Sequence, residues 1–254
     1  MRSDTDAVTI HVASWNTRAV TELCVRSMRR TAGYEFNLTV GDGGSTDGSV
    51  MLLENLAARG WLKLECVEGG RTHAEWLDHW YNSCQTRYLI FSDSDVLYRR
   101  KGWLREMVER AASSNAAMVA TRVQARNGVA YVHPVTGAKR TLAARPEPWL
   151  VLIDLHQTRG VVTTSFAYED GGDPGDGSDQ IAYDVSAAFF RDFETAGLRA
   201  EEMGPGFASA YHHFGGMTWL SGKDSRISWA RRAKQIAKKL YSTAALLRER
   251  LASR

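Results

Sequence analysis

The first half of the chain alternates short apolar runs with stretches of helical periodicity. The strand-like runs are Val8–Ser14, Phe36–Val40, Leu62–Val67, Tyr88–Phe91 and Ala117–Val123. The helical patterns cover Arg18–Arg30, Leu52–Leu56, Thr72–Cys84 and Trp103–Ala112. Such alternation is typical of an α/β fold with a doubly wound, mainly parallel sheet and right-handed crossovers. Ligands of such sheets bind beyond the carboxyl ends of the strands.

The second half of the chain breaks this rhythm. Residues Val129–Arg140 predict a hairpin, Trp149–Leu155 and Val161–Phe166 predict strands, and Gln180–Ala196 predicts a helix that follows an Asp- and Gly-rich loop. The chain has 254 residues and 44% apolar content, which is enough for a substantial core. We expect one large domain over residues 1–225 and a C-terminal helix over 226–254.

Two carboxylates follow the central apolar run. The run Tyr88–Phe91 stops abruptly, and Asp93-Ser94-Asp95 comes after it. An isolated Asp-x-Asp is more often a solvated turn, but its place at the end of an apolar strand favours a functional role for the two carboxylates. In an extended segment, residues i and i+2 point the same way, so both side chains can serve one hard cation. The pattern therefore indicates a Mg²⁺ or Mn²⁺ site.

Charge and cysteine content narrow the class of partner. The formal net charge is only +3, so no nucleic-acid partner is implied. From Gly222 onward, ten Lys or Arg residues against two acidic residues give +8, which leaves −5 for the remainder. Three scattered cysteines (Cys24, Cys66 and Cys84) form neither a disulfide framework nor a zinc motif. Residues 1–7 contain no apolar signal-peptide core, and we expect a cytoplasmic protein.

Four motifs occur together in a fixed order. They are Ser14-Trp15-Asn16, the loop Asp42-Gly43-Gly44-Ser45-Thr46-Asp47-Gly48-Ser49, Asp93-Ser94-Asp95, and His213-Phe214-Gly215-Gly216. This set, spread over about residues 8–220, resembles the GT-A glycosyltransferases and most closely their family 2 group. The resemblance implies a GT-A type sheet. Residues 1–125 would bind the nucleotide sugar, and residues 126–225 would add a hairpin and loops that bind the acceptor.

The resemblance also implies an activity and a set of site residues. The activity is hexosyl transfer from a nucleoside-diphosphate sugar to an acceptor hydroxyl or amine, with inversion at the sugar. The metal ligands would be Asp93, Asp95 and His213, because His213 matches the family's His-x-Gly-Gly segment. The nucleotide-sugar contacts would be Ser14, Asn16, Asp42, Arg71, Asp93, Ser94 and Trp219. Adjacent residues in a strand face opposite ways, so we expect His212 to be structural.

The catalytic base is expected in the acidic loop 169–179. Inverting transfer needs a carboxylate that takes the proton from the attacking acceptor. Five acidic residues lie in this loop, and most of them are expected to be solvated. By resemblance we assign the base to Asp176, with Asp173 as the alternative.

The C-terminal segment predicts a basic amphipathic helix. Its apolar stripe is Ala230, Ala233, Ala237, Leu240, Ala244, Leu247 and Leu251. We expect this stripe to pack on the catalytic domain or on a second subunit in a homodimer. The alternative is peripheral contact with an anionic membrane.

Other functions compete with this interpretation. A retaining GT-A enzyme, a GT-A-like nucleotidyltransferase and a non-catalytic nucleotide-sugar binder would share much of the pattern. A nucleotidyltransferase usually opens with a glycine-rich basic loop, which Ser14-Trp15-Asn16 is not. A dinucleotide-dependent dehydrogenase is disfavoured because no G-x-G-x-x-G follows the first strand.

Overall fold

The structure is a computed structural model, and it describes residues 7–125, 127–132, 139–171, 180–215 and 229–252. The side chains of the last helix are described from Ile236 onward. The bases proposed in the acidic loop, Asp173 and Asp176, and the proposed substrate contact Trp219 lie outside the described residues.

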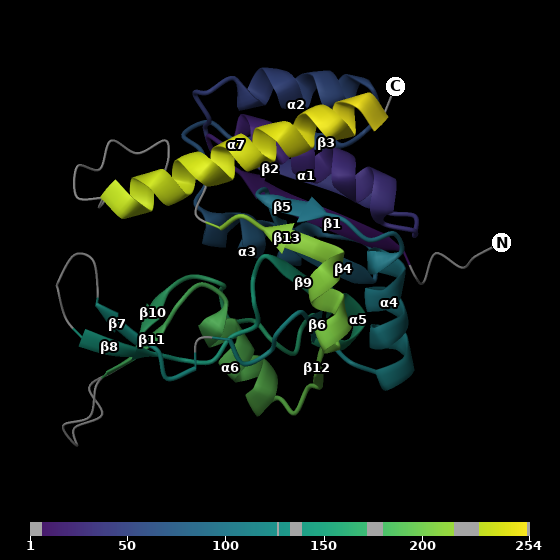
Figure 1. The fold of residues 1–254 in the computed structure, drawn as a ribbon. Helices are drawn as coiled ribbons and strands as arrows, with labels where there is room; N and C mark the ends of the chain where they lie inside the picture. Colours follow the sequence, from purple (N-terminus) through teal and green to yellow (C-terminus); the bar gives the residue numbers. More distant parts are fainter. Residues whose placement is uncertain (1–6, 126, 133–138, 172–179, 216–228, 253–254) are drawn as a thin grey trace. The chain divides into compact units, whose positions relative to one another are not determined.

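A seven-stranded sheet forms the centre of the fold, with the strand order β12-β6-β9-β4-β1-β2-β3 (Figure 1). Its strands are β1 Val8–Ser14, β2 Asn37–Asp42, β3 Lys63–Cys66, β4 Tyr88–Asp93, β6 Met118–Ala120, β9 Leu150–Asp154 and β12 Ala200–Glu202. Strand β2 pairs in parallel with β3, and β12 in parallel with β6, whereas β6 and β9 are antiparallel. The mainly parallel α/β sheet is therefore confirmed.

The helices lie close to the ranges that periodicity predicts in the first half. They are α1 Arg18–Thr31, α2 Ser49–Ala58, α3 His73–Ser83, α4 Trp103–Ser114, α5 Leu155–Thr158, α6 Ala187–Thr195 and α7 Trp229–Ala252, with a 3-10 helix η2 at Pro205–Ala210. Helix α3 begins at a capping box in which Thr72 and Glu75 satisfy each other's backbone N–H groups. The predicted C-terminal helix is confirmed. Among the described residues, no helix is long and apolar enough to span a bilayer.

Two smaller sheets complete the described strands. One has the order β10-β11-β8-β7, with β7 at Ala130–Val132, β8 at Lys139–Leu142, β10 at Glu169–Asp170 and β11 at Gln180–Tyr183. The antiparallel pairing of β7 and β8 confirms the predicted hairpin. The other sheet pairs β5 Val96–Tyr98 with β13 Tyr211–His213, and the sequence pattern predicted neither strand.

Two predictions in the second half are wrong. The segment Gln180–Ala196 is not one helix, because it begins as strand β11 and becomes helical only at Ala187. Ser186, just before α6, has a left-handed backbone with φ 76°, which separates the two elements. Residues Val161–Phe166 form no strand. The buried side chain of Phe166 stacks on Phe189 at 4.2 Å between ring centroids, so its apolar character serves core packing instead.

The central strand β4 of the large sheet is apolar because both of its faces are covered. In β4, Tyr88, Leu89 and Ile90 are all fully buried. A strand buried on both faces needs a continuous apolar run instead of alternation. This explains why the run before Asp93 is apolar throughout, and why the run stops where the strand reaches solvent.

The chain divides into two compact units. One comprises residues 1–9, 72–91 and 107–204, and the other comprises residues 10–71, 92–106 and 205–254. The second unit contains all the described residues that are proposed to bind metal or nucleotide sugar. In this unit α7 packs against α1, and β5 lies beside β13 (Figure 1). The division into donor and acceptor halves near residue 125 stays a prediction.

Candidate active site

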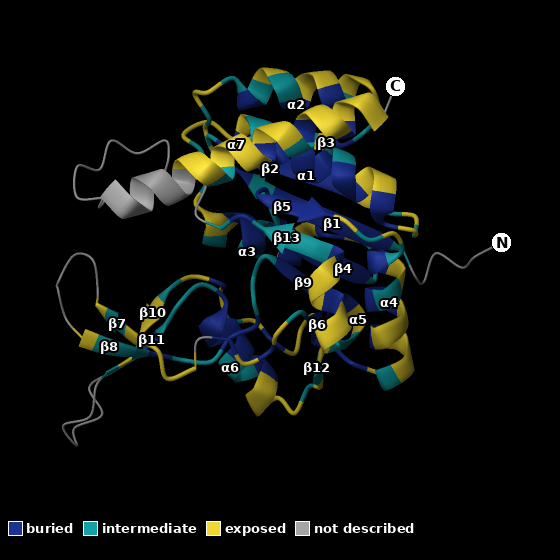
Figure 2. Cartoon of the chain, viewed as in Figure 1, coloured by how far each residue is buried: buried dark blue, intermediate teal, exposed yellow. Residues whose placement is uncertain are grey.

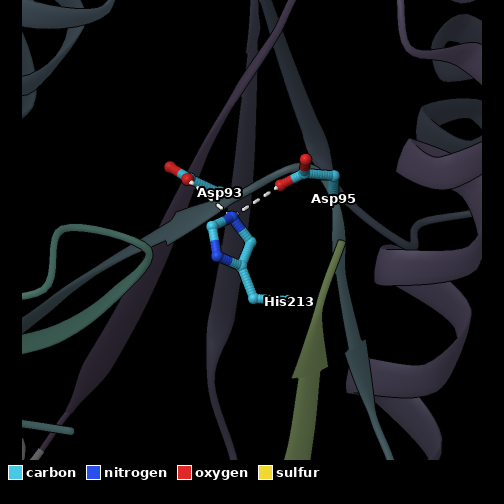
Figure 3. A group of neighbouring side chains, drawn as sticks. All are labelled: Asp93, Asp95 and His213. Carbon is cyan, nitrogen blue, oxygen red and sulfur yellow. Dashed lines mark ion pairs between the residues drawn. The ribbon is translucent and has the colours of Figure 1, made fainter. Parts of the chain in front are cut away.

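Three side chains from two distant parts of the sequence converge in the second unit. Asp93 ends β4, Asp95 lies in the turn before β5, and His213 ends β13. His213 Nε2 lies 3.3 Å from an Asp93 carboxylate oxygen and 3.1 Å from an Asp95 oxygen. Figure 3 shows both carboxylates directed at the same ring nitrogen. One ligand atom from each residue lies within 4.8 Å of the others.

Antiparallel pairing of β5 and β13 brings His213 to the two aspartates. His213 lies opposite Val96, the residue that follows Asp95. The next N–H, that of Phe214, donates to the Asp95 carbonyl at 2.9 Å. Between the aspartates, the Ser94 hydroxyl is buried and lies 3.1 Å from the Thr17 hydroxyl. The turn is therefore fixed from both sides, and Asp93 and Asp95 converge through this turn instead of through an extended strand.

The donor set of the Asp93, Asp95 and His213 cluster fits a divalent cation. Burial lowers the pKa of His213, but its hydrogen bonds to Asp93 and Asp95 outweigh burial and raise that pKa to about 9. A proton therefore holds the cluster together when no cation is bound. Two carboxylates and an imidazole are oxygen and nitrogen ligands of the kind that Mn²⁺ accepts. A bound cation would replace this proton as the positive charge between the carboxylates.

His212 points to a different environment. Its ring contacts Phe214 edge-on at 4.8 Å and Tyr241 at 5.7 Å between centroids. Burial, Arg99 and His213 lower its pKa. The two adjacent histidines thus face opposite ways, as the sequence predicts for a strand, and only His213 joins the cluster.

Asp42 holds the glycine-rich loop that follows β2. Its carboxylate is buried and accepts from the N–H groups of Gly44 and Ser45 at 3.0 and 2.7 Å. It also accepts from the Ser45 hydroxyl at 2.7 Å. Such bonds fix a tight Asx-type loop. Recognition of the base or ribose by Asp42 stays a prediction.

Asn16 joins the loop after β1 to the same glycine-rich loop. Its backbone is left-handed, with φ 51°. Its side-chain oxygen accepts from the Thr46 N–H at 2.7 Å, and its own N–H donates to Ser45 Oγ at 2.8 Å. The carbonyl of Ser14 accepts from the Gly43 N–H at 2.8 Å. The proposed donor residues Ser14, Asn16 and Asp42 therefore belong to one hydrogen-bonded loop assembly.

The loop before α3 packs closely on this assembly. Gly70 has φ +74°, and a Cβ at this position would lie 2.5 Å from the Gly43 carbonyl oxygen. A Cβ at Gly43 would lie 3.1 Å from the Arg71 carbonyl oxygen. Glycine is thus required at position 70, whereas a side chain at position 43 would fit only tightly. This contact places Arg71 beside the glycine-rich loop, as its proposed role needs.

The sequence itself decides the family. Residues 9–169, well over half of the chain, match the family model described as glycosyl transferase family 2. The chain belongs to glycosyl transferase family 2. It is therefore a glycosyltransferase by family, and the resemblance seen in the motifs is confirmed. A comparison with curated protein sequences gives no match.

Solved structures show the fold that this family 2 glycosyltransferase shares. The mannosyltransferase PcManGT from Pyrobaculum calidifontis, in complex with GDP-Man and Mn²⁺, has a TM-score of 0.54 and 15% identity, over 97% of this chain and 74% of that one. TarS 1–349 from S. aureus has a TM-score of 0.46 and 15% identity, over 75% of this chain and 64% of that one. The chain thus spans less than two thirds of the TarS structure. The GT-A fold is confirmed.

The acidic loop of the glycosyltransferase is described only at its start. Glu169 is ion-paired with Arg191 at 2.9 Å. Asp170 is ion-paired with Arg140 at 3.3 Å and accepts from the Tyr168 hydroxyl at 2.7 Å. These two carboxylates are therefore engaged in structural pairs. The bases assigned by resemblance, Asp176 and Asp173, lie outside the described residues, and their roles stay predictions.

Two residues beside the metal cluster had no signal in the sequence. The Nζ of Lys238 in α7 donates to the Gly215 carbonyl at 2.6 Å. This ammonium group therefore contacts a residue that follows His213 by two positions in the sequence. The Cys24 thiol lies 3.6 Å from the Asp93 carbonyl. Burial raises the pKa of Cys24 to about 12, so this thiol stays protonated. Both contacts depend on tertiary packing of helices, which no local motif records.

Proposed function

We propose that the chain is a metal-dependent, inverting glycosyltransferase that moves a hexosyl group from a nucleoside-diphosphate sugar to a hydroxyl or amine. The observation that carries the proposal is the convergence of Asp93, Asp95 and His213 within 4.8 Å. Clustered carboxylates repel one another unless a positive charge lies between them. The close approach of two aspartates and a histidine therefore supports a role in binding a cation.

Asp93, Asp95 and His213 would hold the cation, and Mn²⁺ suits the set better than Mg²⁺. An imidazole is a good ligand for transition metals, whereas Mg²⁺ prefers an all-oxygen octahedron. The presence of Mn²⁺ with GDP-Man in the mannosyltransferase structure supports this choice. The bound cation would supply charge neutralisation for the leaving diphosphate.

The donor would be bound by the loop assembly in the same unit. Asn16, Asp42 and Ser14 would face the base and ribose, and Arg71 would reach a phosphate, which its planar guanidinium can bind bidentately. Ser94 and Trp219 complete the proposed contacts. The amides and hydroxyls of this assembly already bond one another, so the site is rigid before the donor arrives. A preorganised site loses less entropy when it binds a ligand.

The proposed chemistry needs one proton acceptor. The acceptor's O–H or N–H proton passes to the carboxylate of Asp176 while the acceptor atom forms a bond to the sugar C1. The bond between C1 and the diphosphate oxygen breaks on the opposite face, and the nucleoside diphosphate leaves. Asp173 is the alternative base. In a retaining enzyme the product would instead keep the anomeric configuration of the donor.

A thermal-shift experiment tests metal and donor binding together. GDP or UDP is added with Mn²⁺, with Mg²⁺ or with EDTA. A ligand that binds only the native state raises the apparent melting temperature. We expect a rise that requires the diphosphate and a divalent cation together, and a larger rise with Mn²⁺. An equal rise in EDTA would contradict metal dependence. Turnover of the donor, with the anomeric configuration read by NMR, separates inverting transfer from retaining transfer and from mere binding.

The base is tested by Asp176→Asn. We expect a fall in kcat of about 10²- to 10⁴-fold, the usual contribution of a general base. Donor affinity is expected to stay the same, because the donor contacts lie elsewhere. Asp170→Asn is the matched control, because Asp170 is held by Arg140 and Tyr168. If only Asp173→Asn is inactive, the alternative base is correct. Full activity of variants at all five acidic residues of 169–179 would show that the base lies elsewhere, or that the enzyme is retaining and needs none.

A further inference from the structure

Helix α7 has one buried face and one exposed apolar face. Its inner side chains Ser242, Leu246 and Glu249 are buried, and Leu246 packs in a cluster with Val20, Leu23, Leu97 and Phe214. Its outer side carries an apolar row formed by Ile236, Leu240, Leu247 and Leu251, whose side chains are 56%, 68%, 56% and 69% exposed, respectively. At 3.6 residues per turn, these four side chains lie within about 60° of one another. Figure 2 shows this exposed side of α7.

The exposed row corrects the expectation for the apolar stripe. Of the stripe residues whose side chains are described, Ala237, Leu240, Ala244, Leu247 and Leu251 are all exposed. The part of the stripe whose side chains are described therefore does not pack on the catalytic domain. The polar residues Ser242 and Glu249 are turned inward instead, because Glu249 forms an ion pair with Arg30. A row of large aliphatic side chains on one line of a helix is typical of an interaction surface.

The charges around this row are almost all positive. Lys239, Arg248 and Arg250 are exposed on α7, and Arg250 is ion-paired with Glu22 of α1. The one acidic residue in the sequence of α7 is Glu249, which is 8% exposed and engaged with Arg30. The segment from Gly222 onward carries +8. A partner that covers the row must therefore bring negative charge of its own.

A basic pocket is lined in part by other residues of α7. It has a volume of about 250 Å³, and its lining includes Arg30, Arg99, Arg248, Tyr241 and Glu249. Glu249 is paired with Arg30, and Arg99 donates to the Tyr241 hydroxyl at 2.9 Å. Three guanidinium groups and one carboxylate thus line the pocket. Arginine is suited to bind phosphate oxygens through its planar fork of donors.

We propose that α7 binds the surface of an anionic lipid bilayer, with the row Ile236, Leu240, Leu247 and Leu251 in the acyl region and a lipid phosphate in the basic pocket. A helix with an apolar row and basic flanks binds in the plane of such a surface. A second copy of the chain fits less well, because two α7 helices would bring like charges together without an exposed acidic residue on either helix to match them. This surface is separate from the donor site, so the inference stands independently of the reaction.

Co-sedimentation of the full chain with vesicles tests the proposal. One set of vesicles is phosphatidylcholine, and the other is an equimolar mixture of phosphatidylcholine and phosphatidylglycerol. We expect binding to the mixed vesicles that falls steeply with salt, and little binding to phosphatidylcholine alone. Equal binding to both vesicle types, or to neither, would overturn the proposal.

Matched variants assign the binding to α7. The double variant Leu240→Ser with Leu247→Ser is expected to weaken partitioning at least about tenfold, because exposed leucines contribute only when they enter lipid. Met51→Ser, an equally exposed apolar residue on α2, is the control and is expected to bind like the wild type. Unchanged partitioning of the double variant would contradict the role of the row.

A charge variant tests the basic pocket without altering apolar packing. Arg248→Glu is expected to weaken binding to the mixed vesicles about fivefold or more. Arg59→Glu, at the end of α2, is the control. Equal effects of the two variants would show that only net charge matters and would remove the pocket from the proposal. If light scattering shows a dimer that the double leucine variant converts to monomer, the row belongs to a second copy and the lipid proposal is wrong.

Discussion

Asp95 is the residue on which the metal site depends most directly. It is almost buried, and both its side chain and its carbonyl hold the His213 segment. Residues that only hydrogen-bond a metal ligand already change metal affinity about 10- to 100-fold, and Asp95 would bind the cation directly. We therefore expect Asp95→Asn to weaken Mn²⁺ binding at least about a hundredfold and to abolish donor turnover. Calorimetry measures the affinity, and Glu54→Gln on the exposed side of α2 is the control. Full turnover of Asp95→Asn in excess EDTA would contradict the assignment.

His213 makes the stability of the metal-free protein depend on pH. Its pKa is about 9 in the folded chain against an ordinary value of 6.5. The stabilisation from its two carboxylates is complete below pH 6.5 and is lost as pH rises through 9. In EDTA we expect the free energy of unfolding to fall by about 1 to 3 kcal/mol across this window. The His213→Gln variant should lack this fall. Unfolding in urea at several pH values measures it, and a parallel fall in the variant would show that other groups titrate.

At the scale of elements, the two glycine-rich loops meet through backbone contact. A Cβ on Gly70 would collide with the Gly43 carbonyl, whereas nothing lies within 4 Å of a Cβ on Gly69. Both residues are left-handed, so each Ala substitution costs about 1–2 kcal/mol in backbone strain. We expect Gly70→Ala to cost about 1–3 kcal/mol more than Gly69→Ala and to weaken donor binding. Urea unfolding compares the two variants, and equal costs would show that the loops do not touch in solution.

At the scale of the whole molecule, helix α7 near the end of the chain packs in a hydrophobic cluster with α1 near its start. Leu246 is 5% exposed in the cluster with Leu23, whereas its neighbour Leu247 is 56% exposed. We expect Leu246→Ala to lower the free energy of unfolding by about 2–5 kcal/mol. Leu247→Ala should stay within about 0.5 kcal/mol, as surface substitutions usually do. Chemical denaturation measures both variants. Similar values would show that α7 does not pack as described.

The same packing changes the expectation for the C-terminal segment. Arg250 is ion-paired with the buried Glu22, and Lys238 bonds the Gly215 carbonyl near His213. Loss of α7 would uncover apolar residues of α1 and leave Glu22 with fewer partners. Removal of a partner from a buried charge is costly. The helix is therefore part of the catalytic unit on its inner face, and only its outer face is available to a partner.

The sequence by itself determined the α/β class, the strands and helices of the first half apart from β5, and the carboxylate pair Asp93 and Asp95. Each of these depends on short-range periodicity or on residues that are close in the chain. The tertiary structure decided the rest. Strand pairing between β5 and β13 brings His213 to Asp95, and the Arg30 to Glu249 contact joins residues 219 apart in sequence. That contact turns Glu249 of α7 inward, and the apolar row of this helix stays exposed. A buried ion pair depends on where the distant partner lies and not on local hydrophobicity.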